Sequence, residues 1–264
     1  MKSSGHCIIP FFFFAILLVS SPLQGFESRN QKLMAKSVEG SWQITNVKGQ
    51  KLEAKGNLCF LNFDCLKKQM NGFAGCNYIH GKFNFKAKKR QLEFQPLASS
   101  RMACPEMQTE SEILNSLSEI KTFSIQSGID PEHPVLKLNT SNGQEFMTLV
   151  KMMPIDGKWT VVKINDSLVE GGENEIFLFF NSAQKQVHGK IGCNNYNASL
   201  EFSPKKPALV KIGPGITTMM ACPDLDLEQS LLKALSEVVS FKKFSDRKAI
   251  LSNAGGEILI ELAR

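Results

Sequence analysis

Apolar and polar residues alternate in many short stretches of this chain, and a period of two is typical of β-strands. The clearest stretches open with a tryptophan, at Trp42–Val47 and Trp159–Ile164. Further strands are predicted at 58–63, 69–75, 82–85, 91–94, 135–138 and 145–150, and again at 176–180, 186–192, 199–202, 208–212, 249–251 and 257–262. Asn-Gly at 142–143 and Gly-Gly at 255–256 are strong signals for the turns of the last hairpins. The pattern therefore predicts mainly antiparallel sheet.

Two other segments repeat their apolar residues every 3.6 positions, which predicts one helix in each half of the chain. We expect these helices over Pro105–Glu119 and Pro223–Val238. A proline in the first helical turn loses no hydrogen bond, and the acidic residues after it favour the positive end of the helix. The apolar faces comprise Ile113, Leu114, Leu117 and Ile120 in the first helix and Leu227, Leu231, Leu232, Leu235 and Val238 in the second.

The two halves are copies of each other, because several motifs recur in the same order. Gly-Ser-Trp at 40–42 returns as Gly-Lys-Trp at 157–159, and Gly-Cys-Asn at 75–77 returns at 192–194, both 117 positions later. Met-Ala-Cys-Pro at 102–105 returns at 220–223, 118 positions later, so one residue is inserted between 203 and 214. We therefore expect two tandem domains, at 39–151 and 155–264, held against each other by a short linker that carries Pro154.

The first 25 residues have the pattern of a secretory signal peptide. Lys2 supplies the positive start, and Ile8–Val19 is an apolar run that is shorter than the roughly 20 residues a membrane span needs. Cys7 precedes this run, whereas a lipid-modified cysteine would follow it. We expect a released periplasmic or secreted protein whose mature chain begins with an N-terminal segment at 26–38. An uncleaved membrane tether is the alternative.

Export and repetition together predict one disulfide in each domain. Cys76 and Cys104 recur as Cys193 and Cys222, and an oxidising compartment favours their pairing within each copy. Each bridge would tie the Gly-Cys-Asn turn to the start of the helix and contribute roughly 3–4 kcal/mol by loop entropy. Metal binding is the alternative for these cysteines, but the nearby histidines do not correspond between the copies and the spacing of a zinc site is missing.

Two further cysteines, Cys59 and Cys65, have no counterparts in the second copy. On a continuous strand they would be too far apart for a disulfide. We expect Cys59 to be a buried replacement for an aliphatic residue and Cys65 to lie in a turn, where it is either a free thiol or an intermolecular bridge. A local turn that joins the two is a minor alternative.

Composition and charge exclude some functions. The chain is 42% apolar and 21% charged, which is ordinary for a globular protein, and its formal charge of +6 is too small and too dispersed for nucleic-acid binding. The densest basic cluster contains Lys86, Lys88, Lys89 and Arg90. It is a candidate binding site for an anionic lipid, a glycan or a protein, although a solvated hairpin turn explains the same residues.

We find no motif of a catalytic, cofactor or metal site. A nucleophile elbow is missing, and no constellation of reactive groups recurs in both copies. Asn77 and Asn194 are expected to form turns or cap nearby backbone rather than to bind a ligand. Trp42 and Trp159, on alternating strands, are expected in the cores.

These motifs resemble the META/HslJ family, a domain family of unknown function. Its members carry an early tryptophan, a Gly-Cys-Asn-x-Tyr-x-Gly turn and a Thr-x-Met-Ala-Cys segment before a helix. The second copy matches with Tyr196 and Thr218 but has Ala198 in place of the second glycine; the first keeps Gly81 but has Ile79 and Ser100 in place of the tyrosine and threonine. The resemblance implies an α+β domain with an antiparallel sheet or partial barrel, an envelope or secreted location with links to stress tolerance and virulence, and no established catalytic residues.

The leading hypothesis is a non-enzymatic exported protein that acts by binding an unidentified protein or small molecule. A second hypothesis is a carrier that holds a small apolar ligand inside one sheet or at the domain interface, which a pocket lined by Phe177, Phe179 and Phe180 would support. The third is a hydrolase whose site forms between the two domains, which would require a cleft with converging polar groups and a strongly perturbed titratable residue.

Overall fold

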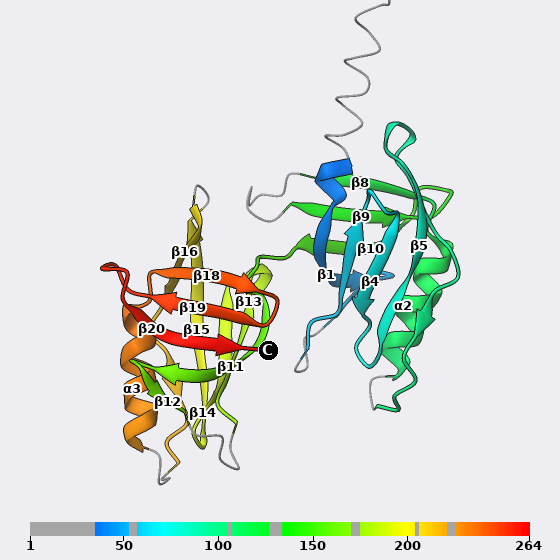
Figure 1. The fold of residues 1–264 in the computed structure, drawn as a ribbon. Helices are drawn as coiled ribbons and strands as arrows, with labels where there is room; N and C mark the ends of the chain where they lie inside the picture. Colours follow the sequence, from blue (N-terminus) through cyan, green and yellow to red (C-terminus); the bar gives the residue numbers. More distant parts are fainter. Residues whose placement is uncertain are drawn as a thin grey trace, which may run out of the picture.

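The computed structural model describes residues 35–52, 57–104, 107–126, 134–169, 175–203, 206–220 and 225–264. These residues form two similar β-barrels joined by a short linker (Figure 1). The predicted α+β fold, with two tandem copies of a small antiparallel domain, is confirmed. The expected leader at 1–25 and most of the segment at 26–38 lie outside the described residues. No helix in the described ranges is long and apolar enough to cross a bilayer.

The two barrels have the same order of elements. The first contains β1 (Gly40–Val47), β2 (Gln50–Lys51), β3 (Phe60–Asp64), β4 (Gln69–Phe73), β5 (Tyr78–Lys86), a 3-10 turn (Ala87–Lys89), β6 (Gln91–Phe94), β7 (Ala98–Ser99), α2 (Met107–Glu119), β8 (Thr122–Gln126), β9 (Val135–Asn139) and β10 (Glu145–Lys151). The second contains β11 (Gly157–Ile164), β12 (Ser167–Leu168), β13 (Phe177–Asn181), a 3-10 turn (Ser182–Gln184), β14 (Gln186–Ile191), β15 (Asn194–Ser203), β16 (Lys206–Ile212), β17 (Ile216–Thr217), α3 (Leu225–Glu237), β18 (Ser240–Ser245), β19 (Lys248–Ser252) and β20 (Ile258–Ala263).

Each sheet closes on itself through its first and last long strands. In the first barrel the strand order runs β1-β3-β4-β5-β6-β8-β9-β10, and β10 pairs antiparallel with β1. In the second barrel β20 pairs with β11 in the same way. Among the described residues, one residue pair joins β6 to β8 (Gln91–Thr122) and one joins β16 to β18 (Leu209–Ser240), so each ring is least tightly paired at these two neighbouring strands.

Side chains of alternating strand residues fill the barrel interiors. Trp42 and Ile44 on β1 and Trp159 and Val161 on β11 point inward and are almost fully buried. The core of the first barrel also includes Val38, just before the expected start of the domain, in a helical segment at 35–38. The tryptophans are core residues, as predicted.

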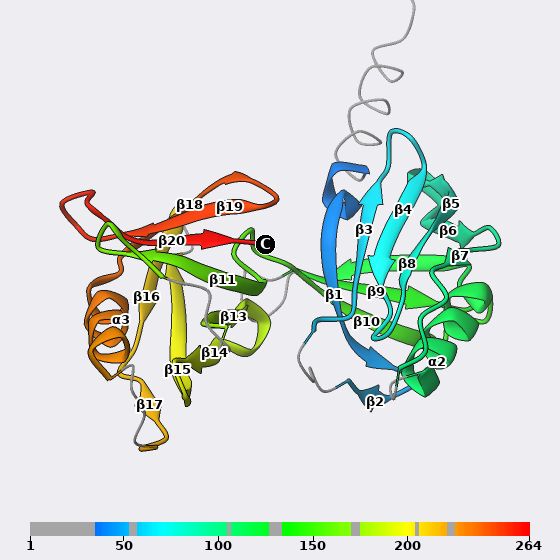
Figure 2. The same cartoon turned by 60° about the horizontal axis from the view of Figure 1, so that its bottom comes forward.

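The helices cover the ends of the barrels and lie far from the linker. The helix α2 contacts β1 and β6, which are opposite each other in the ring, so it crosses the barrel mouth. Its residues Ile113, Leu117 and Ile120 belong to the core, as do Leu231 and Leu235 of the second domain. In Figures 1 and 2, α2 and α3 lie on opposite outer flanks of the molecule, with the linker between the barrels.

The alternation of residues located most of the long strands to within a few positions but missed β8, β18 and the two-residue strands β2, β7, β12 and β17. Both β8 and β18 follow the helix directly, and β8 pairs with β6 on one side and β9 on the other. These two strands complete the rings. The observed helices begin at Met107 and Leu225, because the expected first turns at 105–106 and 223–224 lie outside the described residues.

The disulfide between Cys76 and Cys104 is present, with a Cα–Cα distance of 5.7 Å, which confirms that prediction. Cys193 is also disulfide-bonded, and its expected partner Cys222 lies outside the described residues.

Cys59 and Cys65 are free thiols. Cys65 is buried against the core of the first barrel, and its N–H donates to Glu39 Oε2 at 2.8 Å. Burial does not suit the alternative of an intermolecular bridge. It also raises the pKa of Cys59 to about 11, and burial together with the negative charge of Glu39 raises the pKa of Cys65 to about 12.

The two barrels fill one corner of the interior differently. In the second barrel Tyr196 is buried, and a Cβ on Gly215 would lie 2.1 Å from the Cε2 of its ring. The first barrel has the smaller Ile79 at the position of Tyr196 and the larger Leu97 at the position of Gly215. The volume lost at one position is therefore replaced at the other.

This exchange also explains the motif glycine that only the first copy keeps. A Cβ on Gly81 would lie 2.6 Å from Leu97 Cδ2. The second barrel has no leucine there, so Ala198 takes the glycine position without that contact. The departures of each copy from the family motif are consequences of core packing.

We predict that Gly215→Ala destabilises the second barrel by about 1–3 kcal/mol, because the new methyl group overlaps the ring of Tyr196. Adding Tyr196→Ile, the side chain that the first barrel uses, should restore most of the loss. Chemical denaturation of the two variants and the parent measures this coupling. Equal destabilisation with and without Tyr196→Ile would contradict the packing argument.

We also predict that iodoacetamide labels neither Cys59 nor Cys65 in the native protein at pH 8, under conditions that label both in guanidinium. A pKa of about 11 leaves about one thiol in a thousand of Cys59 ionised at this pH. The raised pKa values also mean that folding stability falls as the pH rises above about 9, where the unfolded thiols ionise first. Peptide mass spectrometry would detect labelling, and rapid native modification of Cys59 would refute the prediction.

Candidate functional site

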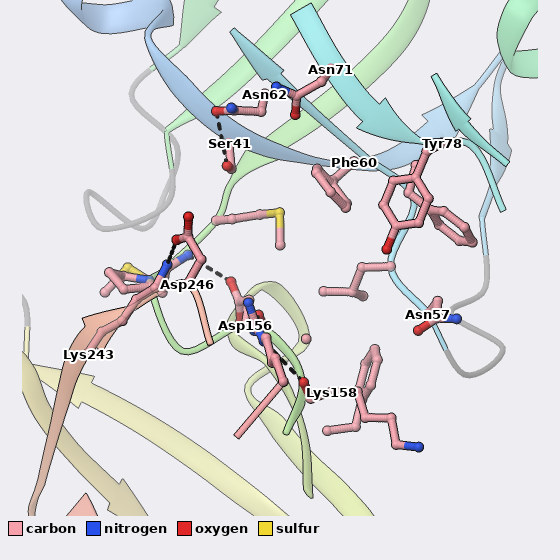
Figure 3. Close-up of a pocket in the computed structure, with 18 of the residues that line it drawn as sticks. Ser41, Asn57, Phe60, Asn62, Asn71, Tyr78, Asp156, Lys158, Lys243 and Asp246 are labelled. Atoms are coloured by element: carbon pink, nitrogen blue, oxygen red, sulfur yellow. Dashed lines mark hydrogen bonds and ion pairs between the residues drawn. The ribbon is translucent and has the colours of Figure 1, made fainter. Parts of the chain in front are cut away.

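A cleft of about 740 Å³ lies between the two barrels, beside the linker (Figure 3). One wall is the outer face of β1, β3, β4 and β5 of the first barrel. The other consists of the linker, β11, β13, the β18–β19 turn and the C-terminal Arg264. Both walls are built from strands whose inward residues form the cores, so the cleft rests on rigid elements.

The first wall carries a row of short polar side chains. Ser41, Asn62 and Asn71 pair across β1, β3 and β4 and alternate with inward core residues, so they point outward. Ser41 Oγ donates to Asn62 Oδ1 at 3.2 Å (Figure 3). The amide nitrogens of Asn62 and Asn71 have no hydrogen-bond partner among the described residues, so they are available to a ligand.

A row of aromatic side chains runs beside this polar row. The two rows are two residue positions apart along the strands. Phe60, Phe73 and Tyr78 pair across β3, β4 and β5. Phe73 is buried, and its ring lies 5.2 Å from that of Tyr78, centroid to centroid. Tyr78 remains 63% exposed, and its hydroxyl points into the cleft (Figure 3).

Hydrogen bonds at both ends hold the linker wall in place. Met152 N–H donates to Ser41 O at 3.0 Å, and Met153 N–H donates to Asp156 Oδ2 at 2.7 Å. Asp156 is buried and also accepts from the backbone N–H and the hydroxyl of Ser182, at 2.6 and 2.5 Å. The linker is therefore tied to β1 of the first barrel and to the 3-10 turn of the second.

A cation from the last strand stacks on the tryptophan of each barrel. Arg264 lies 3.9 Å above the ring of Trp159, and Lys151 lies 4.6 Å above that of Trp42. Arg264 donates to the backbone carbonyls of Lys158, at 3.1 Å, and Asp156. Burial lowers the pKa of both Arg264 and Lys151. The nearby carboxyl groups act in the opposite direction and offset only part of this decrease. This repeated arrangement, which sequence analysis missed, positions the floor of the cleft.

The charged side chains that line the cleft are all engaged within the protein. Lys158 contacts Glu175 at 2.6 Å, and Lys243 contacts Asp246 at 2.6 Å. These lysines lower the pKa of Glu175 and of Asp246. Lys243 thus favours the ionised form of Asp246, one of the described residues that line the cleft. Raised pKa values occur at half-buried Cys59 and at buried Cys65 and Tyr196, none of which lines the cleft.

The aromatic residues of the carrier hypothesis do not share one pocket. Phe180 lies in the barrel core, and Phe177 is covered by Lys158, 4.4 Å from its ring. Phe179 points outward, stacks on His188 and lines the cleft. Since large side chains fill the barrel interiors, this arrangement does not favour an apolar ligand inside a barrel.

Asn77 and its counterpart Asn194 serve the fold instead of the cleft. Asn77 Nδ2 donates to Glu110 Oε2 at 2.8 Å and to Met102 O at 3.1 Å, while its Oδ1 accepts from Ser100 Oγ at 2.7 Å and from Met102 N at 2.8 Å. It caps backbone as expected, although this backbone is distant in sequence, and the residue with positive φ is Gly75.

The second barrel repeats every one of these contacts. Asn194 binds Glu228 at 2.7 Å, Met220 at 3.2 and 2.8 Å, and the hydroxyl of Thr218 at 2.7 Å. Ser100 replaces this threonine in the first copy because either hydroxyl supplies the same donor. Glu110 and Glu228, which the sequence assigned to helix-end electrostatics, thus have a further role as buried acceptors.

The structure places the basic cluster of Lys86, Lys88, Lys89 and Arg90 on the exposed β5–β6 turn. Lys86 ends the strand that Tyr78 begins, so about 27 Å of β5 separates the cluster from the cleft. A small cavity beside it is lined by Asn84, Lys86, Gln91 and Glu93. The cluster therefore stays a separate candidate.

Of the cleft residues, the sequence pointed only to Phe179, because the others belong to strands with an ordinary alternating pattern. The available signal was the difference between the copies: at the positions of Ser41, Asn62 and Asn71 the second copy has Lys158, Phe179 and His188. Among the described residues, no group of three histidine, cysteine or acidic side chains is arranged to bind a metal.

Comparison with known proteins agrees with the repeat. The model of the META domain family matches twice, at residues 35–153 and 150–264. An NMR structure of a protein from Burkholderia xenovorans is similar over 55% of this chain and 99% of its own, with 22% identity and a TM-score of 0.37. A crystal structure of a DUF4847 family protein from Bacteroides vulgatus is similar over 43% of this chain and 92% of its own, with 12% identity and a TM-score of 0.33. A search of curated proteins finds no match.

We predict that Asn77→Ala destabilises the first barrel by about 2–4 kcal/mol, because it removes the partner of the buried Glu110 carboxyl group and two hydrogen bonds to the backbone of Met102. The matched control is Asn197→Ala, an exposed asparagine in the middle of β15, which should change stability by less than about 0.5 kcal/mol. Urea denaturation followed by circular dichroism measures both. Equal stabilities of the two variants would contradict the assigned role.

Proposed function

Because the chain belongs to the META domain family and carries two copies of the domain, we propose that it is an exported, non-enzymatic binding protein. Its ligand would occupy the cleft between the copies. The observation that carries this proposal is the lining itself: unpartnered amides and an exposed tyrosine stand on a rigid sheet, while the charged groups are already paired. Such a lining provides recognition without a group for proton transfer or nucleophilic attack.

Export is supported by two independent features. The chain starts with a segment that has the composition of a secretory leader, and its first domain carries the disulfide between Cys76 and Cys104. We place the mature protein in the periplasm or outside the cell. A contribution to stress tolerance or virulence is the physiological setting that the META family resemblance favours.

The test is ligand capture from the native compartment. The mature protein would be recovered from that compartment, and co-purifying molecules would be identified by mass spectrometry. A double variant, Asn71→Ala with Tyr78→Ala, should lose the captured ligand because it removes one amide and the exposed ring of the cleft. Asn197→Ala should retain it, because this exposed amide lies on β15 and does not line the cleft.

Retention of the same ligand by the double variant would refute the cleft as the site. Turnover of any substrate in an activity screen, lost on Asp246→Asn, would instead establish the hydrolase. Both variants replace exposed side chains, so thermal unfolding should show that they fold like the parent.

A further inference from the structure

We propose that the cleft takes a neutral polyhydroxylated ligand, a short oligosaccharide, on the outer face of the first barrel. This inference rests on the proposed function and adds the chemical class of the ligand. The polar row of Ser41, Asn62 and Asn71 and the aromatic row of Phe60, Phe73 and Tyr78 carry it.

The spacing of the two rows suits a ligand with a polar edge and an apolar face. Neighbouring strands lie about 4.8 Å apart, and residues two positions along a strand lie about 7 Å apart. The two rows therefore form a small grid that alternates hydrogen-bonding groups with rings. A sugar ring has the same division, because its hydroxyl groups project from its rim and its C–H bonds form the faces.

The polar row has free capacity for hydroxyl groups. An amide offers one acceptor and two donors, so it binds a hydroxyl that both donates and accepts. Within the described residues, Asn71 uses none of this capacity and Asn62 uses only its oxygen, for Ser41.

The aromatic row has one ring positioned to stack. Phe73 is buried and packs against Tyr78 at an interplanar angle of 60°, which restricts the tyrosine ring. Tyr78 itself is exposed and directs its hydroxyl into the cleft (Figure 3). A supported, exposed ring beside free amides provides a stacking surface at low entropic cost.

The charges favour a neutral ligand over an ionic one. Lys158, Lys243 and Arg264 are each engaged with carboxyl or carbonyl oxygens of the protein. An anionic ligand would have to displace these contacts. A neutral polyol leaves them in place and needs only the unpartnered amides.

The fold disfavours two other ligand classes. An extended peptide usually adds to a free strand edge, whereas β1, β3, β4 and β5, which form the cleft wall, are each paired with a neighbour on both sides. A lipid chain needs a long apolar channel, whereas amides and charged groups interrupt this lining.

The second barrel shows that the grid is not a requirement of the fold. At the positions of Phe60, Phe73 and Tyr78 it has Phe177, Lys190 and Asn195, and it keeps the inward tryptophan and the buried asparagine. The copies thus share interior residues and differ on the face that lines the cleft.

The experiment is a titration of the mature protein with neutral tetrasaccharides, a β-1,4-glucan, an α-1,4-glucan and a β-1,4-linked N-acetylglucosamine, by calorimetry. The probes for comparison are a tetragalacturonate, which is anionic, and a medium-chain fatty acid. We expect at least one neutral sugar to bind and to be preferred over both comparison probes.

Variants then test the grid. Tyr78→Ala should weaken binding of that sugar about tenfold, and Asn71→Ala about fivefold, because each removes one contact. Tyr78→Phe keeps the ring and should lose at most about threefold, and Asn197→Ala should change nothing. Each variant replaces an exposed side chain, and a thermal melt should confirm folding.

Failure to bind any neutral sugar, a preference for the anionic or apolar probe, or binding that is insensitive to Tyr78→Ala would overturn the inference. Native capture separates this failure from failure of the proposed function. A captured molecule that is not a sugar, and that Asn71→Ala with Tyr78→Ala abolishes, would refute the oligosaccharide while leaving the cleft as a binding site.

Discussion

The pairing of the first strand with the last strand is the constraint on which the rest of the molecule depends. In each domain it joins segments about a hundred residues apart and turns an open sheet into a ring. This pairing also places the inward tryptophan of the first strand beneath the cation at the end of the last strand. The strand β10 leads directly into the linker and then into β11. The paired strands β1 and β10 of the first barrel and the start of the second barrel therefore meet at the cleft. Closure therefore builds two stable rings and also positions the wall between them.

The two copies solve the same packing problem with different residues. Tyr196 beside Gly215 occupies the space that Ile79 and Leu97 occupy in the first barrel. Close-packed interiors permit such paired exchanges, because total volume is kept while each single change would cause overlap or a void. A departure from a family motif is then a packing effect and does not by itself indicate a different function.

Buried polar groups changed less between the copies than the surface did. Asn77 and Asn194 make the same contacts with a glutamate and a backbone segment, because a buried amide or carboxyl group left without partners is costly. The outer strand faces are free of that constraint. There the first copy has amides and exposed tyrosine, whereas the second has lysine, histidine and a buried phenylalanine. Because these outward positions can vary, the two copies of the fold give the cleft two different walls.

The sequence by itself determined the duplication, most strands, both helices and the pairing of Cys76 with Cys104, because these follow from local periodicity and repeated spacing. It did not determine barrel closure, because the pairing of β1 with β10 and of β11 with β20 joins segments about a hundred residues apart in the chain. Nor did it identify the cleft. Ser41, Asn71 and Tyr78 are ordinary outward residues of separate strands, and only strand pairing and the linker bring them together. Local patterns record which side of a strand is buried, whereas the tertiary structure decides which exposed sides meet.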